Sequence, residues 1–317
     1  MELPDFPPRP SLDDAFDKLS RAKGHFEVLR GEVEPFEERD THTISVEVDP
    51  DAGHYTFSVH GLEATPESDW GLIAGDCLHN GRSALDYLVV RLFALATMKR
   101  PRDIGSIQFP IYDDPKRFNS ATAEMRKTPS FNGYLARIEE LQPFNRGNAS
   151  IWGTHPQEHP PIPPMPVFHY LPIALNRLSA LNNIDKHRVI HAAWLGINAS
   201  TARDFAAPMS PPADFEFARS NTTTGPLKND TEIGSVTFKT PLPSKWQPSD
   251  VDMKRNFPLH VAIFDEAGFA EGVLEVLGSC LWAVESVLTI FSPVFADPQE
   301  PPLPVTAIPN LDPVPFP

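Results

Sequence analysis

Two short segments hold the ionisable side chains whose types and spacing could do chemistry: GDCLHNGRSALDYL (residues 75–88) and LNNIDKHRVIH (residues 181–191). Guanidinium, imidazole and carboxylate groups brought together can bind an anion, transfer a proton or pair with one another. The candidate site residues in these segments are Asp76, His79, Arg82, Asp86, Asp185, His187, Arg188 and His191.

The first segment has the spacing of an amphipathic helix. His79 and Asp86 fall on nearly one line of a helix, beside a core stripe that includes Leu78 and Leu85. Arg82 and Asp86 have the spacing of an ordinary intrahelical ion pair. Because paired surface charges far outnumber catalytic ones, a hydrated or internally paired polar edge is the simpler interpretation, and a functional site is the alternative.

The second segment belongs to a longer predicted helix, LPIALNRLSALNNIDKHRVIHAAWLG (residues 171–196). Steps of three and four residues along one face of this helix connect Leu178, Leu181, Ile184, Arg188, His191 and Leu195. Arg188 and His191 are therefore expected on a core-facing line. A buried guanidinium requires a carboxylate partner, and Asp86 and Asp185 are the candidates.

Metal, nucleophile and nucleotide signatures are weak or missing. His187 and His191 could place two imidazoles on one helix face, but a metal site needs a third ligand and no HExxH pattern is present. A hydrogen-bonded histidine pair is therefore expected, without a metal. Cys77 and Cys280 lie in apolar helical runs and are expected to be buried thiols, and GxSxG, GxGxxG and GxxxxGK[ST] do not occur. No cofactor is expected.

The elements that must position these groups predict an α+β fold, a helical bundle of about four main helices with attached antiparallel β-hairpins. Helical periodicity runs from Ser11 to near Pro35, from about residue 67 to Thr97, over 171–196 and over Val273–Phe291, with short helices within 118–129 and 134–144. Alternating residues predict strands at 44–48, 55–59, 235–240 and 259–265. Residues 206–229 are expected to form a loop.

Composition bounds the domain organisation and the partners. Of 317 residues 36 are proline, which predicts a flexible N-terminus (1–10), a single domain (11–292) and a proline-rich tail (293–317). The net charge of −15 opposes an extended nucleic-acid surface. No signal peptide is visible and charges interrupt the longest apolar runs, so a soluble cytoplasmic protein without membrane contact is expected. Its partner would be a protein or a small molecule, and a homodimer is compatible with the sequence.

Four segments carry a resemblance. GDCLHNGRSALDYL, QFPIYDD, LQPF and LNNIDKHR, in this order within about residues 65–195, resemble a family of uncharacterised bacterial proteins. Its members have an LHN-x-RSALD helix, an FPI-x-D segment and an N-x-I-D-K-H-R helix. The family has no established activity, so the resemblance implies no catalytic role. Its pattern has leucine where this chain has Gly81. A mid-helix glycine is unfavourable, so a close helix contact is expected there.

Two hypotheses of function emerge. In the first, which the sequence favours, Arg82, Asp86, Asp185, Arg188 and His191 form one buried network that fixes helix packing, while loops and the proline tail bind a partner. The protein would then have a structural or binding role, and Asp86→Asn would lower the melting temperature strongly without changing any ligand-dependent property. A solvent-open pocket lined by these groups would count against this hypothesis.

The second hypothesis is enzymatic. Helical bundles with an inward arginine and histidine are similar to the HEPN class of metal-independent ribonucleases. Arg188 would hold a phosphate, and His187 or His191 would act as general acid and base. Two observations oppose it: the usual spacing, with four to six residues between the arginine and the histidine, does not occur at 188–191, and the net charge is unfavourable for RNA.

Overall fold

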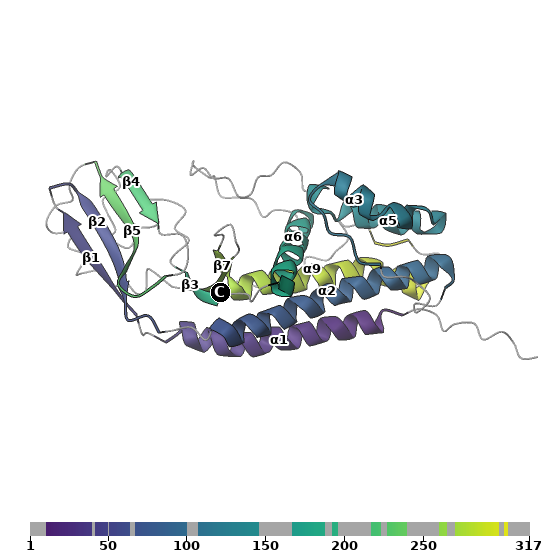
Figure 1. Ribbon diagram of the computed structural model, residues 1–317, viewed down its shortest axis with the longest axis horizontal. Helices are drawn as coiled ribbons and strands as arrows, with labels where there is room; N and C mark the ends of the chain where they lie inside the picture. Colours follow the sequence, from purple (N-terminus) through teal and green to yellow (C-terminus); the bar gives the residue numbers. More distant parts are fainter. Residues whose placement is uncertain are drawn as a thin grey trace, which may run out of the picture.

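The chain has an α+β fold. The computed structural model describes residues 11–39, 42–49, 51–63, 67–99, 107–145, 167–187, 192–195, 217–222, 227–239, 260–264, 270–297 and 301–303. The three longest helices run side by side along the longest axis, with a β-sheet at one end and short helices at the other (Figure 1).

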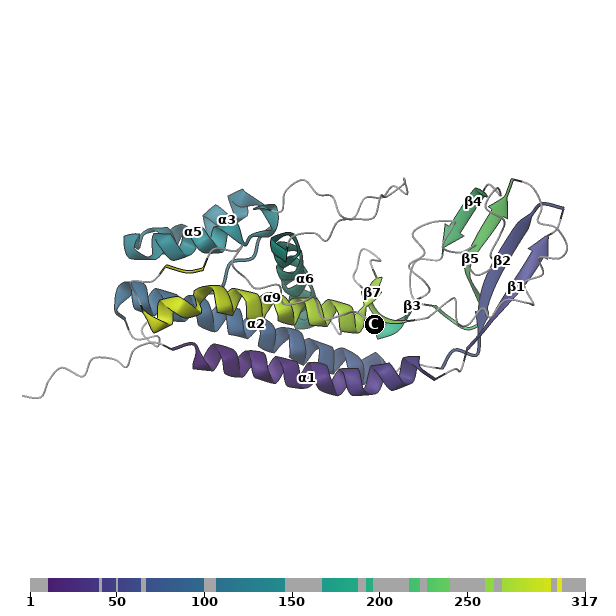
Figure 2. The same cartoon turned by 180° about the vertical axis from the view of Figure 1, so that it is seen from behind.

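Four long helices form the bundle. They are α1 (Asp13–Glu37), α2 (Glu67–Thr97), α6 (Val167–His187) and α9 (Val273–Ala296). Helix α2 contacts each of the other three, and α6 lies across α9 and α2 (Figure 2). On α9, Leu277, Leu281, Val284 and Leu288 are all buried, and Leu274 is partly buried against the core.

Helix α9 is apolar enough and long enough to cross a membrane by composition alone. Most of its apolar side chains are instead buried against α1, α2 and α6. Such burial is typical of the core helix of a soluble protein, because a helix that is apolar on most of its circumference must be covered by other elements.

Two strand assignments differ from the sequence expectations. The predicted helix over 171–196 ends at His187, and Ala192–Leu195 forms strand β3, paired with β6 (His260–Phe264). Residues 217–222, expected in a loop, form strand β4 (Phe217–Thr222), paired with β5 (Thr231–Phe238). In both places hydrogen bonds to a distant strand override the local pattern. Helix α6 also starts at Val167, before the expected start.

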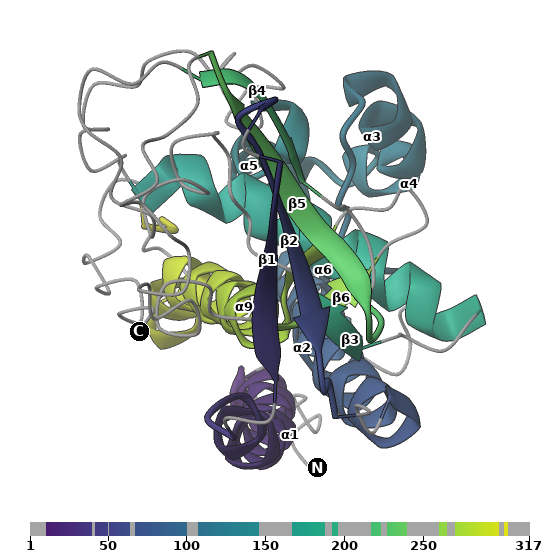
Figure 3. The ribbon, with the colours of Figure 1, turned by 90° about the vertical axis from the view of Figure 1, so that its left-hand side faces the viewer.

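The strands form two antiparallel sheets. The first has the order β1-β2-β5-β4, with β1 (Thr43–Asp49) and β2 (His54–His60) as the expected hairpin. On β2, Tyr55, Phe57 and Val59 are buried and alternate with half-exposed residues. The second sheet has the order β3-β6-β7, where β7 (Ala270–Gly272) leads directly into α9. Figure 3 shows the larger sheet in front of the bundle when the molecule is viewed along its long axis.

Short helices cover one flank of the bundle. They are α3 (Pro115–Ala121), α4 (Ala123–Arg126) and α5 (Asn132–Glu140), with single turns at Pro129–Phe131 and Pro143–Asn145. This confirms the short helices expected within 118–129 and 134–144, with shifted bounds. Buried side chains anchor them to the core: Phe118, Met125, Phe131, Leu135 and Ile138. An extended segment, residues 107–112, runs between these helices and the bundle.

Gly81 lies where α2, α6 and α9 meet, so the helix contact expected at this glycine is present. A Cβ at this position would lie 3.7 Å from Val284 Cγ2 and 3.9 Å from both Leu178 Cδ1 and Leu281 Cδ2. These are ordinary van der Waals distances. The contact is therefore close enough to exclude a large side chain but leaves room for one methyl group.

We expect Gly81→Ala to raise the free energy of unfolding by about 0.5–1 kcal/mol, because alanine favours the helix and fills the space. Urea unfolding followed by circular dichroism measures the change. Gly31→Ala on α1 is the matched control, since no atom lies within 4 Å of its Cβ position and only helix propensity acts there. A loss of stability at Gly81 alone would mean that the helices pack more tightly than described.

Candidate functional site

The carboxylate of Asp86 and the guanidinium of Arg82 bind the backbone of the extended segment. Asp86 Oδ1 accepts a hydrogen bond of 2.8 Å from the Phe109 N–H, and Arg82 Nη2 donates to the Phe109 carbonyl oxygen. Arg82 Nη2 also lies 3.2 Å from Asp86 Oδ1, so the intrahelical ion pair expected from the sequence is confirmed. One pair of charges therefore satisfies both backbone groups of a residue that lies in no helix or strand.

Gln142, which is fully buried, supplies the remaining bonds to this segment. Its Oε1 accepts from the Tyr112 N–H at 2.9 Å, and its Nε2 donates to the Pro110 carbonyl oxygen at 2.8 Å. Nε2 also donates to the Ile138 carbonyl oxygen at 3.0 Å. We call residues 107–112 the clamped segment, because side chains from both of its flanks hold its backbone.

The Arg82 side chain is largely buried, with 12% of its surface exposed. Burial lowers the pKa of Arg82, and the neighbouring Asp86 carboxylate opposes this shift. A guanidinium keeps its charge in proteins even when its pKa falls somewhat, so the site contains a permanent cation. The pairing with Asp86 compensates the cost of burying it.

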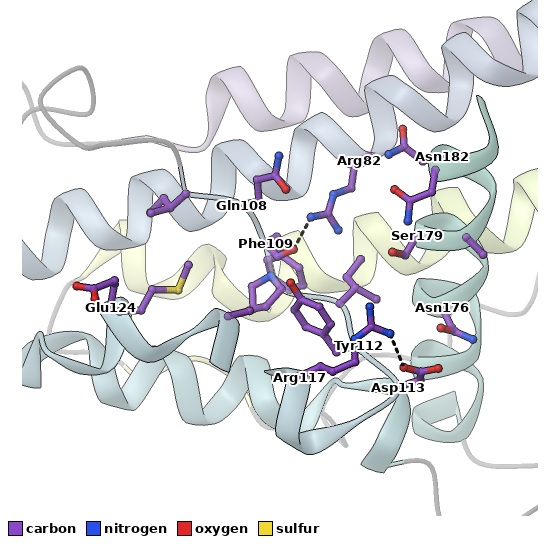
Figure 4. Close-up of a pocket in the computed structure, with 17 residues that line it drawn as sticks. Arg82, Gln108, Phe109, Tyr112, Asp113, Arg117, Glu124, Asn176, Ser179 and Asn182 are labelled. Atoms are coloured by element: carbon purple, nitrogen blue, oxygen red, sulfur yellow. Dashed lines mark hydrogen bonds and ion pairs between the residues drawn. The ribbon is translucent and has the colours of Figure 1, made fainter. Parts of the chain in front are cut away.

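A cavity of about 590 Å³ opens beside Arg82, between α6, the clamped segment and the short helices (Figure 4). The face of α6 that borders it is polar, since Asn176, Ser179 and Asn183 succeed one another at helical spacing. The opposite wall is more apolar and includes Ile107, Ile111, Tyr112 and Met125. The cavity therefore has one hydrogen-bonding side, one apolar side and a cation at one end.

Asn182 also borders this cavity, and it is almost completely buried, at 2% exposure. Within the described parts of the chain its Oδ1 accepts no hydrogen bond. Most buried polar atoms in folded proteins have a partner, so such an acceptor calls for an explanation.

A second polar group lies where α2 meets the end of α6. Asp185 approaches Gly75 so closely that a Cβ on this glycine would lie 2.1 Å from Asp185 Oδ1. Burial raises the pKa of Asp185, the charge of His79 opposes this shift, and that of Asp76 adds to it. Three of the predicted site residues are therefore brought together here, with His79 and Asp76 on the exposed side.

The single buried network predicted from the sequence is not observed; its described members fall into two separate groups along α2. Arg82 and Asp86 hold the clamped segment, whereas Asp76 and His79 accompany Asp185. Arg188 and His191 lie outside the described residues, as does the side chain of His187, so their roles stay predictions. The prediction that this helical line continues to Leu195 is wrong, because Ala192–Leu195 forms β3. Among the described residues no cluster of three histidine, cysteine, aspartate or glutamate side chains could hold a metal.

Sequence reasoning missed Phe109, Gln142 and Asn182. Two of them contribute uncharged amides, and Phe109 contributes only its backbone, so charge spacing could not reveal them. The available signal was their place in QFPIYDD, LQPF and LNNIDKHR, three of the segments that carry the family resemblance.

Ser45, His60 and Asp230 on the large sheet make the contacts of a hydrolase catalytic triad, but they lack the burial and the oxyanion-binding donors of one. Ser45 Oγ lies 2.7 Å from His60 Nε2, and His60 Nδ1 lies 2.6 Å from Asp230 Oδ1. A triad carboxylate is normally buried, and N–H donors face the site where the oxyanion forms. Here the Asp230 side chain is 79% exposed and Ser45 lies within a strand at the edge of the sheet. The three residues link β1, β2 and the turn before β5.

Comparison with protein-family models, with curated proteins and with solved structures gave no match. Membership of the bacterial family therefore stays a prediction. The structure does bring its four segments together: Arg82 and Asp86 belong to the first, Phe109 to the second, Gln142 to the third and Asn182 to the fourth.

We expect Asp86→Ala to lower the free energy of unfolding by about 2–4 kcal/mol, because it leaves the Phe109 N–H without an acceptor and the buried guanidinium without its carboxylate. Chemical denaturation measures the loss. The matched control is Asp113→Ala, which removes another i,i+4 ion pair, with Arg117, whose side chains are 62% and 69% exposed. That change should cost less than about 1 kcal/mol. Equal losses would show that the clamp adds little.

The contact between Gly75 and Asp185 should appear as a coupling in a double-mutant cycle. In an Asp185→Ala background, Gly75→Ala should stabilise the protein by about 0.5–1 kcal/mol through helix propensity. In the natural chain the same change should destabilise it, because the new methyl group displaces the Asp185 carboxylate. Free energies of unfolding for the four proteins test this, and additive effects would contradict the described approach.

Proposed function

We propose that this protein is a soluble, cytoplasmic binding protein that takes a small polar molecule into the cavity beside Arg82. The observation that carries the proposal is a buried guanidinium at the end of an open cavity of about 590 Å³. This volume lies within the range of about 300–1,000 Å³ that is typical of ligand pockets. The mixture of an apolar wall and a few convergent polar groups is equally typical of such pockets.

The purely structural hypothesis accounts for only part of the site. It explains Asp86, whose carboxylate binds the clamped segment and Arg82. It does not explain why the guanidinium borders an open cavity, although Arg82 is the one member of the predicted network among the residues described as lining it. In this proposal Arg82 has two roles, holding the segment through Nη2 and presenting its other N–H groups to a ligand.

Binding is favoured over covalent chemistry by the residues around the cavity. Its described lining contains neither histidine nor cysteine, and Ser179 has no imidazole beside it there to act as a base. The ribonuclease hypothesis, which depends on Arg188 with His187 or His191, stays a separate prediction. RNA cleavage assays on Arg188→Ala and His191→Ala test it, and full activity in both variants would end it.

The proposal is tested by a ligand screen, followed by a substitution on α6 that fills the cavity. Differential scanning fluorimetry with separate panels of amino acids, nucleosides, monosaccharides and inorganic phosphate should find at least one class that raises the melting temperature of the natural protein. A ligand at about 100 times its Kd should stabilise the folded state by about 2.7 kcal/mol. Ser179→Trp should abolish this shift because the indole occupies the cavity.

The matched control is Ser20→Trp, at an exposed position of α1 outside the cavity lining, which should leave the shift unchanged. Two results would contradict the proposal. The first is that no panel stabilises the natural protein, and the second is that Ser179→Trp binds the stabilising compound as tightly as the control does.

A further inference from the structure

The polar wall of the cavity consists of side chains that the protein itself leaves unused. Asn176, Ser179 and Asn183 line the cavity from α6, and none of them forms a hydrogen bond with another described residue. Other helical serines behave differently, since the hydroxyls of Ser279 and Ser292 donate to a carbonyl oxygen of the preceding turn. The Ser179 hydroxyl does not, and Figure 4 shows it directed into the cavity. This face of α6 is therefore available to a ligand.

The opposite side of the cavity offers an aromatic ring and a guanidinium with free N–H groups. Burial lowers the pKa of Arg82, while Asp86 and Tyr112 act against this change, so the Tyr112 phenol lies near the guanidinium. Both hydrogen-bonding contacts of Arg82 with described residues involve Nη2. Its Nε and Nη1 are not among the buried atoms without a partner, so they retain accessible surface. An aromatic group thus stands beside unused donors.

The cavity is lined by charges of both signs. Arg82 and Arg117 can only donate hydrogen bonds, whereas the carboxylates of Asp113 and Glu124 can only accept them. Arg117 lies 4.0 Å from Asp113, and Glu124 pairs with Lys127. A hydroxyl group donates one hydrogen bond and accepts two, so it can bind beside either kind of charge without separating these pairs. A molecule that carries several hydroxyl groups therefore suits this lining.

Resting on the proposed function, we infer that the cavity binds a neutral saccharide. The C–H groups on one side of its ring pack against the Tyr112 ring, whose face carries partial negative charge. Its hydroxyl groups bind Asn176, Ser179 and Asn183 on α6 and accept from Nε or Nη1 of Arg82. Side-chain amides suit this task because each one both donates and accepts, as neighbouring hydroxyl groups of a sugar do.

The first experiment compares saccharides with a ring analogue that lacks their hydroxyl groups. Saturation-transfer-difference NMR titrations on the natural chain use the methyl α-glycosides of glucose, galactose and mannose, the disaccharides maltose and lactose, and tetrahydropyran-2-methanol, which keeps the ring without its hydroxyls. At least one saccharide should bind saturably and at least about tenfold more tightly than tetrahydropyran-2-methanol, because the analogue loses several hydrogen bonds. Acetate and inorganic phosphate are titrated as ionic probes.

Substitutions on α6 then locate the bound saccharide. Asn176→Leu and Asn183→Leu remove an amide that has no partner among the described residues, so each should weaken saccharide binding by about fivefold or more. The matched control is Asn132→Leu, at an exposed position of α5 outside the cavity lining, which should leave binding unchanged. Circular dichroism checks that the variants fold, and Ser179→Ala replaces either of them that does not.

Three results would overturn the inference: no saccharide binds, tetrahydropyran-2-methanol binds as tightly as the saccharides do, or both α6 variants bind like the control. The proposed function would survive any of these results if acetate, phosphate or another class of compound still bound and Ser179→Trp abolished its binding. It would fail together with the inference if no compound bound, or if Ser179→Trp left the binding intact.

Discussion

The fold depends on satisfying the backbone of a segment that belongs to no regular element. Residues 107–112 run between the bundle and the short helices, where water cannot serve all of their polar groups. Arg82 and Asp86 bind both backbone groups of Phe109, and Gln142 binds those of Pro110 and Tyr112. An apolar residue in place of Arg82, Asp86 or Gln142 would leave a buried donor or acceptor unpaired, which costs about 1–3 kcal/mol for each group.

This constraint also produces the cavity. The clamped segment lies between α6 and the helices α3 and α4, so the polar face of α6 meets a space rather than a packed wall. A loop held only by apolar contacts could collapse onto Asn176 and Ser179. A segment fixed by directional hydrogen bonds at Phe109, Pro110 and Tyr112 cannot do so without breaking them. The rigidity that stabilises the fold therefore preorganises the candidate binding site.

The sequence predicted what depends on local periodicity and missed what depends on distant partners. The helical repeat located α2 and α9, and the spacing of Arg82 and Asp86 predicted their ion pair correctly. The end of α6 was misjudged because the helical steps from Leu178 continue to Leu195, whereas pairing with β6 makes Ala192–Leu195 a strand. The roles of Gln142 and Asn182 depend on which backbone groups lie nearby, and no pattern along the chain encodes that.

Gly75 and Gly81 show how α2 approaches α6 at two different points. At Gly75 the missing side chain admits the Asp185 carboxylate, whereas at Gly81 it admits only apolar side chains of α6 and α9 at ordinary distances. Helix α6 is thereby brought close to α2 along a line that ends near Asp185, with Asn182 one turn before it. The position of Asn182 beside Arg82 results from that approach.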